Sequence, residues 1–122
     1  MRFLCLVYGD EKTLQDMPFD ECVAYDAQLR AGGQCLASES LQPTATAATV
    51  RVRNGKLHVT DGPFMETKEI LAGFYLVEAP DLEGAIALAA KIPPAAVGSI
   101  EVRPIRDLRE MVKARANEKL TA

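Results

Sequence analysis

Residues 2–8, Arg-Phe-Leu-Cys-Leu-Val-Tyr, decide the fold of this chain: they form a short apolar run that ends at Gly9-Asp10. A run of this length bounded by turn residues is typical of a buried β-strand. Residues 70–78, Ile-Leu-Ala-Gly-Phe-Tyr-Leu-Val-Glu, repeat the pattern. The expected faces of this second strand are Leu71, Tyr75, Val77 and, opposite them, Ala72, Phe74, Leu76. Both strands are apolar on two sides, so each predicts a sheet that is covered on both faces.

The segments around these strands predict two helices. Helical spacing of apolar residues begins at Phe19, and Gly32-Gly33 ends that helix. Asp81 is the predicted N-cap of a second helix, which Pro93-Pro94 closes. The remaining predicted segments are a polar loop at 10–18, a strand at 34–37, a loop at 38–46 and a strand at 99–105. This order is the β-α-β-β-α-β plan of a ferredoxin-like α+β fold with a four-stranded antiparallel sheet.

An extra β-hairpin is predicted within this plan. Two alternating runs, residues 49–53 and 56–60, flank Asn54-Gly55. Asn-Gly between alternating runs is the strongest short hairpin signal, because both turn positions need a positive φ. The hairpin delivers the chain to Asp61.

The plan places both helices on one face of the sheet and leaves the other face bare. Burying apolar surface is worth roughly 25 cal/mol per Å², and a bare apolar face favours aggregation. We therefore expect a homodimer in which two copies associate sheet against sheet. The alternative is that the C-terminal segment, residues 106–122, folds back over the face. That segment is predicted to be a charged helix or tail outside a domain of residues 1–105.

Composition limits the class of protein. The chain has 122 residues and a net charge of −3, whereas nucleic-acid-binding domains usually carry a basic patch. The apolar run Ile70 to Val77 is far shorter than the roughly 20 residues of a membrane-spanning helix, and no signal peptide is expected. Cys5, Cys22 and Cys35 lack metal-site spacing; the first two are expected to be buried and Cys35 more accessible. A cytoplasmic protein without a metal or cofactor is predicted.

The segment Asp61-Gly62-Pro63-Phe64-Met65-Glu66-Thr67-Lys68-Glu69 concentrates ionisable residues at a Gly-Pro turn. Asp61 follows a strand end, where its carboxylate either accepts backbone N–H bonds of the turn or handles a proton at a pocket mouth. In an extended segment Glu66 and Lys68 share a face, which is either solvated or part of a polar cleft.

Charged residues also alternate along the last predicted strand. Ile100 and Val102 lie on one face, and Glu101 and Arg103 lie on the other. If the apolar pair packs on the helices, the charged pair points into the space between two sheets, where charges must be paired or used. The alternative is an edge-strand ion pair that reaches water.

Three other polar side chains are weaker candidates. Tyr8 and Tyr75 lie on the central strands, where aromatic core packing is expected rather than a ligand contact. His58 alternates with Leu57 and Val59 on a hairpin strand, so a solvated histidine is expected rather than a general base.

Several short motifs stand along the chain: Leu41-Gln42-Pro43, Val50-Arg51, Val59 to Phe64, Glu66 to Glu69, Gly73-Phe74-Tyr75 and Gly98 to Pro104. Together they resemble the DGPF-type members of the YCII-related family, over about residues 1–105. The resemblance implies a ferredoxin-like dimeric α/β barrel and, from genes often found beside extracytoplasmic-function sigma factors, a regulatory context. Some relatives carry a His-Asp pair suggested as an acid-base site. The only histidine here, His58, matches no motif position.

Two hypotheses follow. In the first, a homodimer forms a polar pocket lined by Glu66, Lys68, Glu101 and Arg103 that binds a small polar or anionic molecule. Asp61 is then the proton-handling candidate of cofactor-free acid-base or lyase-type chemistry. In the second, the protein is a non-catalytic accessory or regulatory partner of a sigma factor, and residues 106–119 face that partner.

Overall fold

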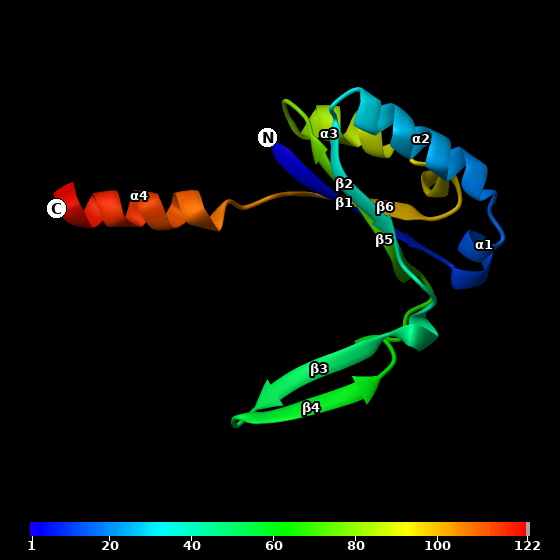
Figure 1. The fold of residues 1–122 in the computed structure, drawn as a ribbon, viewed down its shortest axis with the longest axis horizontal. Coiled ribbons are helices and arrows are strands. Elements are labelled where there is room, and N and C mark those ends of the chain that lie inside the picture. Colours follow the sequence, from blue (N-terminus) through cyan, green and yellow to red (C-terminus); the bar gives the residue numbers. More distant parts are fainter. Residues whose placement is uncertain (122) are drawn as a thin grey trace.

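The computed structural model describes residues 1–121 (Figure 1). The strands are β1 (Arg2–Gly9), β2 (Cys35–Ser40), β3 (Ala48–Arg53), β4 (Lys56–Asp61), β5 (Ile70–Glu78) and β6 (Ser99–Pro104). The α-helices are α1 (Glu11–Gln15), α2 (Phe19–Ala31), α3 (Leu82–Ala89) and α4 (Leu108–Thr121), and short 3-10 turns span Thr44–Thr46 and Pro93–Ala96. Over these described residues, no helix is both long enough and apolar enough to cross a membrane.

Four strands form one antiparallel sheet in the order β2-β5-β1-β6. Helices α2 and α3 lie side by side above one face of this sheet (Figure 1). The sequence-predicted β-α-β-β-α-β plan with a four-stranded antiparallel sheet is therefore confirmed. The N-cap of α3 is also as predicted, because Asp81 Oδ1 accepts a 2.8 Å hydrogen bond from the Gly84 N–H.

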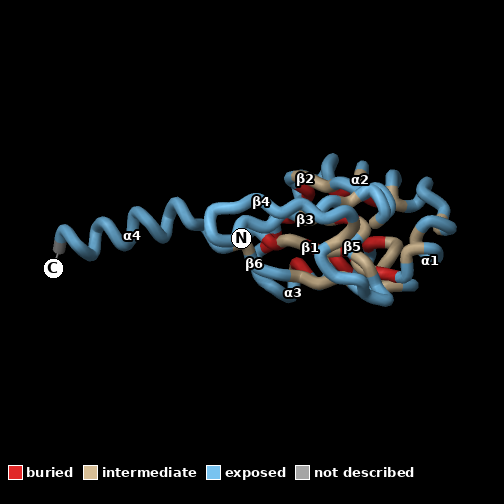
Figure 2. The backbone as a smooth tube through the Cα atoms, turned by 90° about the horizontal axis from the view of Figure 1, so that it is seen from below, coloured by how far each residue is buried: buried red, intermediate tan, exposed pale blue. Residues whose placement is uncertain are grey.

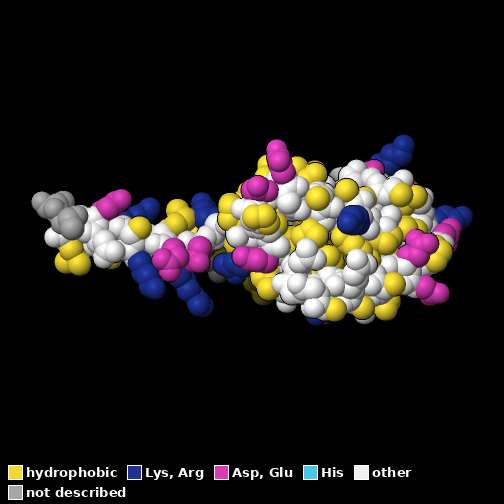
Figure 3. Space-filling model, turned by 90° about the horizontal axis from the view of Figure 1, so that it is seen from above, with side chains coloured by type: hydrophobic (Ala, Val, Ile, Leu, Met, Phe, Trp, Pro, Cys, Tyr) yellow, Lys and Arg dark blue, Asp and Glu magenta, His cyan; other side chains and the backbone are white. Residues whose placement is uncertain are grey.

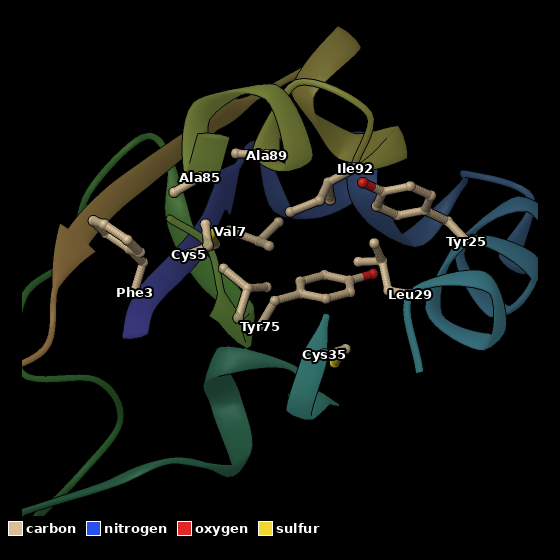
Figure 4. Packing of buried hydrophobic residues seen from close by; sticks show 12 residues of the cluster. Phe3, Cys5, Val7, Tyr25, Leu29, Cys35, Tyr75, Ala85, Ala89 and Ile92 are labelled. Carbon is tan, nitrogen blue, oxygen red and sulfur yellow. The ribbon is translucent and has the colours of Figure 1, made fainter. Parts of the chain in front are cut away.

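The hydrophobic core lies between the sheet and the two helices (Figure 4). Strand β1 contributes Phe3, Cys5 and Val7, which are all buried. The helix side of the core is made by Tyr25, Leu29, Ala85, Ala89 and Ile92. Figure 2 shows buried residues only in this part of the molecule, whereas α4 and the hairpin β3–β4 are exposed along their lengths.

The opposite face of the sheet is apolar and bare, and we call it the open face. It carries Leu4, Leu6, Phe74 and Leu76, each only half-buried. Within residues 1–121 no helix packs on the open face, because α4 projects away from the domain (Figure 1). The alternative in which the C-terminal segment covers this face is therefore wrong for residues 106–121; residue 122 lies outside the described residues.

The hairpin β3–β4 forms a second, separate sheet. Its turn is as predicted, with φ values of 54° at Asn54 and 74° at Gly55. The hairpin extends from the domain on the side opposite α2 and α3, so it lies on the side of the open face (Figures 1 and 2).

The predicted loop at residues 10–18 is wrong in part, because the short helix α1 forms there. Asp10 begins this helix: its Oδ2 accepts hydrogen bonds from the Thr13 backbone N–H (3.1 Å) and the Thr13 hydroxyl (2.9 Å). The backbone bond, and then the hydroxyl bond, hold the pKa of the Asp10 carboxyl below its usual value. The side-chain cap thus stabilises a helix in a segment whose polar composition predicts a loop.

The predicted face of Leu71 is wrong, because a β-bulge places this residue on the other face of the sheet. The pairing of β1 with β5 shifts register after Val7, so Tyr8 lies opposite Leu71 instead of Ala72. Directly opposed residues share a face, so Leu71 joins Tyr8 on the open face and leaves the face of Tyr75. Simple alternation along β5 cannot reveal this shift.

The expected accessibility of Cys35 is also wrong. Cys35 pairs with Val77 at the start of β2 and is 8% exposed, as part of the core. Cys5 is buried as expected, and Cys22 is half-buried.

Candidate functional site

A cavity of about 410 Å³ lies on the helix-covered side, between α2 and the sheet edge formed by β2 and β5. We call it the α2–β2 cavity. Much of its lining is apolar and comes from Leu14, Met17, Phe19, Cys22 and Val23. Phe19 and Val23 are mainly exposed and lie at the rim. The volume is in the range of small-molecule pockets in proteins.

A network of side chains centred on Asp26 forms the polar part of this lining. The Ser38 hydroxyl donates a short hydrogen bond to Asp26 Oδ1, and Arg30 Nε donates to Asp26 Oδ2 over 2.9 Å. Arg30 also donates to the Ser38 hydroxyl over 2.8 Å. The hydrogen bond and charge of Asp26 raise the pKa of Arg30 above its usual value. The network therefore fixes the Asp26 carboxylate at the junction of α2 and β2.

Tyr75 supplies a second polar group from the sheet. Its ring extends from β5 toward α2 (Figure 4) and lines the cavity. Burial, with smaller effects of Cys22 and Asp26, raises the pKa of Tyr75 to about 12, so the hydroxyl is protonated near neutral pH. Within residues 1–121 this hydroxyl has no hydrogen-bond partner, yet it is not fully buried. It is a free donor in a mostly apolar site.

The charges of the lining are acidic. Asp26 and Glu39 line the α2–β2 cavity, and the described lining contains no lysine or arginine. Arg30 neutralises Asp26, and the mostly apolar lining offers no unpaired cation to an anion, so the cavity suits an uncharged molecule better than an anionic one. Within residues 1–121, no three His, Cys, Asp or Glu side chains lie together in a group that could hold a metal ion.

A second groove, of about 520 Å³, lies at the root of the hairpin on the side of the open face. Its lining includes Tyr8, Pro43, Phe64, Met65 and Leu71. It is almost wholly apolar and offers few groups for chemistry. We regard it as part of the bare apolar surface.

The structure separates the sequence-predicted site residues. Glu101 and Arg103 form an ion pair with each other at the sheet edge, with 40% and 69% of their side chains exposed. Asp61 ends β4 and Glu66 lies in the following loop; both are exposed, and neither side chain has a hydrogen bond or ion pair within residues 1–121. Lys68 lies near Asp10, whose pKa it helps to lower. None of the five lines either cavity described above.

The geometry expected for the loop after Asp61 also differs. Residues 62–69 form bends and turns instead of an extended strand, and Gly62 has a φ of 97°. The argument that Glu66 and Lys68 share one strand face therefore does not apply. Glu69 accepts a 3.2 Å hydrogen bond from the Ser99 hydroxyl, which ties this loop to β6.

Ile100 and Val102 pack against the core as predicted, so Glu101 and Arg103 do lie on the other face of β6. His58 is exposed on β4, in agreement with its predicted solvated role. Tyr75 packs in the core as expected and also lines the cavity.

Sequence reasoning missed Asp26 and Ser38, and it ranked a ligand contact of the Tyr75 hydroxyl below core packing. A partial signal was present, since Cys22, Asp26 and Arg30 are four residues apart and lie along one stripe of a helix. The partner Ser38 could not be assigned, because a bulge at the start of β2 sets its register against β5.

Comparison with known proteins identifies the family of this chain. Residues 1–109 match the profile of the YCII-related domain. An uncharacterised protein of Rhizobium meliloti (strain 1021) is 38% identical over 98 residues, which is 79% of this chain and 75% of that protein. The profile match includes α2, β2 and β5, so the elements around the cavity are family elements.

Proposed function

Because the chain belongs to the YCII-related family, we propose that it is a homodimer that binds a small, mostly apolar and uncharged molecule in the α2–β2 cavity. The observation that carries this proposal is the Tyr75 hydroxyl, a protonated donor without a protein partner inside an apolar cavity. A ligand with a carbonyl or ether oxygen would satisfy that donor.

Two groups would then hold the ligand. Tyr75 donates to its oxygen, and the Asp26–Ser38 pair offers a fixed acceptor to any donor on the ligand. Leu14, Met17 and Phe19 surround the apolar body. Should the bound molecule be transformed, Asp26 is the carboxylate placed to take up a proton in this cavity. Asp61, the acid-base residue predicted from the sequence, would take up a proton only in a site to which a second copy of the chain contributes residues.

The predicted anionic ligand has less support. It relied on Arg103 and Lys68, but Glu101 neutralises Arg103 and the cavity lining contains no lysine or arginine to hold an anion. The homodimer itself is supported by the open face, whose apolar side chains have no cover within residues 1–121.

A pair of variants tests the cavity. The probes are a library of small neutral carbonyl compounds, screened by thermal shift. Tyr75→Phe removes the donor and should weaken binding of a hit about tenfold. Tyr8→Phe is the matched control, because Tyr8 lies on the opposite face of the sheet, and should leave binding unchanged.

A second pair tests the location. Cys22→Phe places a ring in the cavity and should abolish binding, whereas Ala24→Phe adds the same ring on the exposed side of α2. Compounds that bind Cys22→Phe as tightly as the wild type would show that the binding site lies outside this cavity, and would refute the proposal.

A regulatory role is the second candidate, and α4 favours it. This helix projects from the domain, and Figure 3 shows that it carries hydrophobic and charged side chains of both signs. Leu108, Met111 and Val112 are exposed on it. For this second role, we propose that the chain is a DGPF-type, cytoplasmic protein linked to a sigma factor. Helix α4 would then contact the partner. Removal of residues 108–122 should then abolish the interaction and preserve ligand binding.

A further inference from the structure

The hairpin β3–β4 has one apolar face and one polar face, although it stands apart from the core. The cross-strand pairs Val50–Val59 and Val52–Leu57 occupy one face, and their side chains are 59–67% exposed. The other face carries Thr49–Thr60, Arg51–His58 and Arg53–Lys56. Such a division is typical of a hairpin that buries one side and leaves the other in water.

Nothing within residues 1–121 covers the apolar side of the hairpin. The hairpin forms its own two-stranded sheet, and its residues are exposed with the exception of Thr49. An isolated two-stranded hairpin is marginally stable in water, and needs a third strand or a packed apolar face. The missing cover must therefore come from another molecule.

The position of the hairpin favours a second copy of this chain as that molecule. The hairpin extends on the side of the open face, opposite α2 and α3 (Figures 1 and 2). A copy seated on the open face would therefore approach the hairpin as well. The apolar groove at the hairpin root, whose lining includes Leu71 of the open face, extends the bare surface toward the hairpin. The Phe64 ring of this groove lies 5.3 Å from the guanidinium of Arg51, on the polar face of the hairpin.

The area that a dimer needs supports the same conclusion. Four strands about 4.8 Å apart and about 20 Å long give the open face a footprint of roughly 400 Å². Stable interfaces bury about 800 Å² on each partner. The sheet face alone supplies about half of this area, and one face of the hairpin adds roughly half as much again, so the hairpin makes up part of the difference.

We propose that the hairpin β3–β4 is an arm that packs against the second subunit. Its apolar side chains, Val50, Val52, Leu57 and Val59, are buried in that contact. This inference rests on the proposed homodimer and adds to it a contact surface separate from the open face. It also accounts for the charge pattern of the arm, because Arg53 and Lys56 lie on the face away from the partner, as does Arg51, whose guanidinium lies 5.3 Å from the centroid of the Phe64 ring.

Two neighbouring rungs of the hairpin provide a matched test. The double variant Val52→Ser/Leu57→Ser changes the apolar rung, and Arg51→Ser/His58→Ser changes the adjacent polar rung of the same two strands. The dimer dissociation constant is measured by sedimentation over a dilution series of the full chain. We expect the apolar-rung variant to raise it at least tenfold and the polar-rung variant to change it less than threefold.

Circular dichroism of each variant checks that the core, which the hairpin does not enter, is intact. Hydrogen exchange provides an independent readout: amides of residues 48–61 should be protected in the dimer and lose protection in the apolar-rung variant. A dimer whose stability the apolar rung does not affect would refute the arm and leave the homodimer standing. Equal weakening by both variants would refute the apolar-face contact. A monomeric wild-type chain would refute both the arm and the homodimer.

Discussion

The hydroxyl of Tyr25 donates a 2.6 Å hydrogen bond to the backbone carbonyl oxygen of Leu88. This bond joins α2 to the last turn of α3. Tyr25 is 8% exposed and its ring lies 6.5 Å from that of Tyr75, in a tilted arrangement. The bond therefore fixes the spacing of the helices next to the α2–β2 cavity.

Replacement of Tyr25 by phenylalanine should cost about 1 kcal/mol of unfolding free energy, because the Leu88 carbonyl loses its side-chain donor while the ring remains. Urea unfolding measures the loss. Tyr8→Phe serves as the control, since within residues 1–121 the Tyr8 hydroxyl makes no hydrogen bond; a change below about 0.5 kcal/mol is expected there. Equal losses in both proteins would contradict the structural role of the Tyr25 hydroxyl.

A second prediction concerns the close approach of Gly98 to β1. A Cβ atom on Gly98 would lie 2.2 Å from the Tyr8 carbonyl oxygen and 3.1 Å from the Gly9 Cα. Backbone atoms cannot move aside as a flexible side chain does, so Gly98→Ala should destabilise the protein by at least about 2 kcal/mol. The melting temperature measures this effect. A Gly98→Ala protein as stable as the wild type would mean that the turn before β6 is displaced from β1.

The fold was predictable because its signals are local. Two-sided strands, the Asn54-Gly55 turn and the Asp81 cap each depend on residues close in sequence, and each is found in the structure. The errors arise where non-local pairing decides the outcome. The bulge after Val7 moves Leu71 to the other face, and the pairing of Cys35 with Val77 buries a thiol next to a turn.

The candidate site was less predictable for the same reason. The density of charge predicted a polar site at Asp61, Glu66 and Lys68. Charged residues at a bend are commonly solvated, and these three are exposed. The α2–β2 cavity instead joins Asp26 from a helix, Ser38 from an edge strand and Tyr75 from a central strand. Only the packing of α2 on the sheet brings these three together.

A third prediction uses the thiols. Burial, together with the charge of Cys35, raises the pKa of Cys5 to about 11 from an ordinary value of 9.0. A thiol with a raised pKa in the folded state stabilises the fold below pH 9, and this contribution is lost as the pH rises toward 11. We expect the unfolding free energy to fall by roughly 2 kcal/mol over this range. Cys5→Ala should flatten the profile; an unchanged slope in that variant would assign the effect to other groups.

Thiol labelling gives a fourth prediction. Cys22 is the half-buried thiol of the cavity wall, whereas Cys5 and Cys35 are buried. Burial, and then the charge of Glu21, raises the pKa of Cys22, so its alkylation should be slow at pH 8 and faster at higher pH. Mass spectrometry of the native protein after iodoacetamide treatment should show Cys22 modified first. A cavity ligand should protect it. Earlier modification of Cys35 would contradict its burial in β2.

The last prediction concerns the open face. Leu6 lies at its centre, between Phe74 of β5 and Glu101 of β6. In a sheet-to-sheet homodimer, Leu6→Lys would bury two like charges across the two-fold axis, and desolvation of those charges would oppose association. We expect its dimer dissociation constant to rise at least tenfold in sedimentation experiments. Ile86→Lys, on the exposed side of α3, introduces the same charge outside the proposed interface and should leave the dimer intact. A Leu6→Lys protein that dimerises as tightly as the wild type would place the interface elsewhere on the molecule.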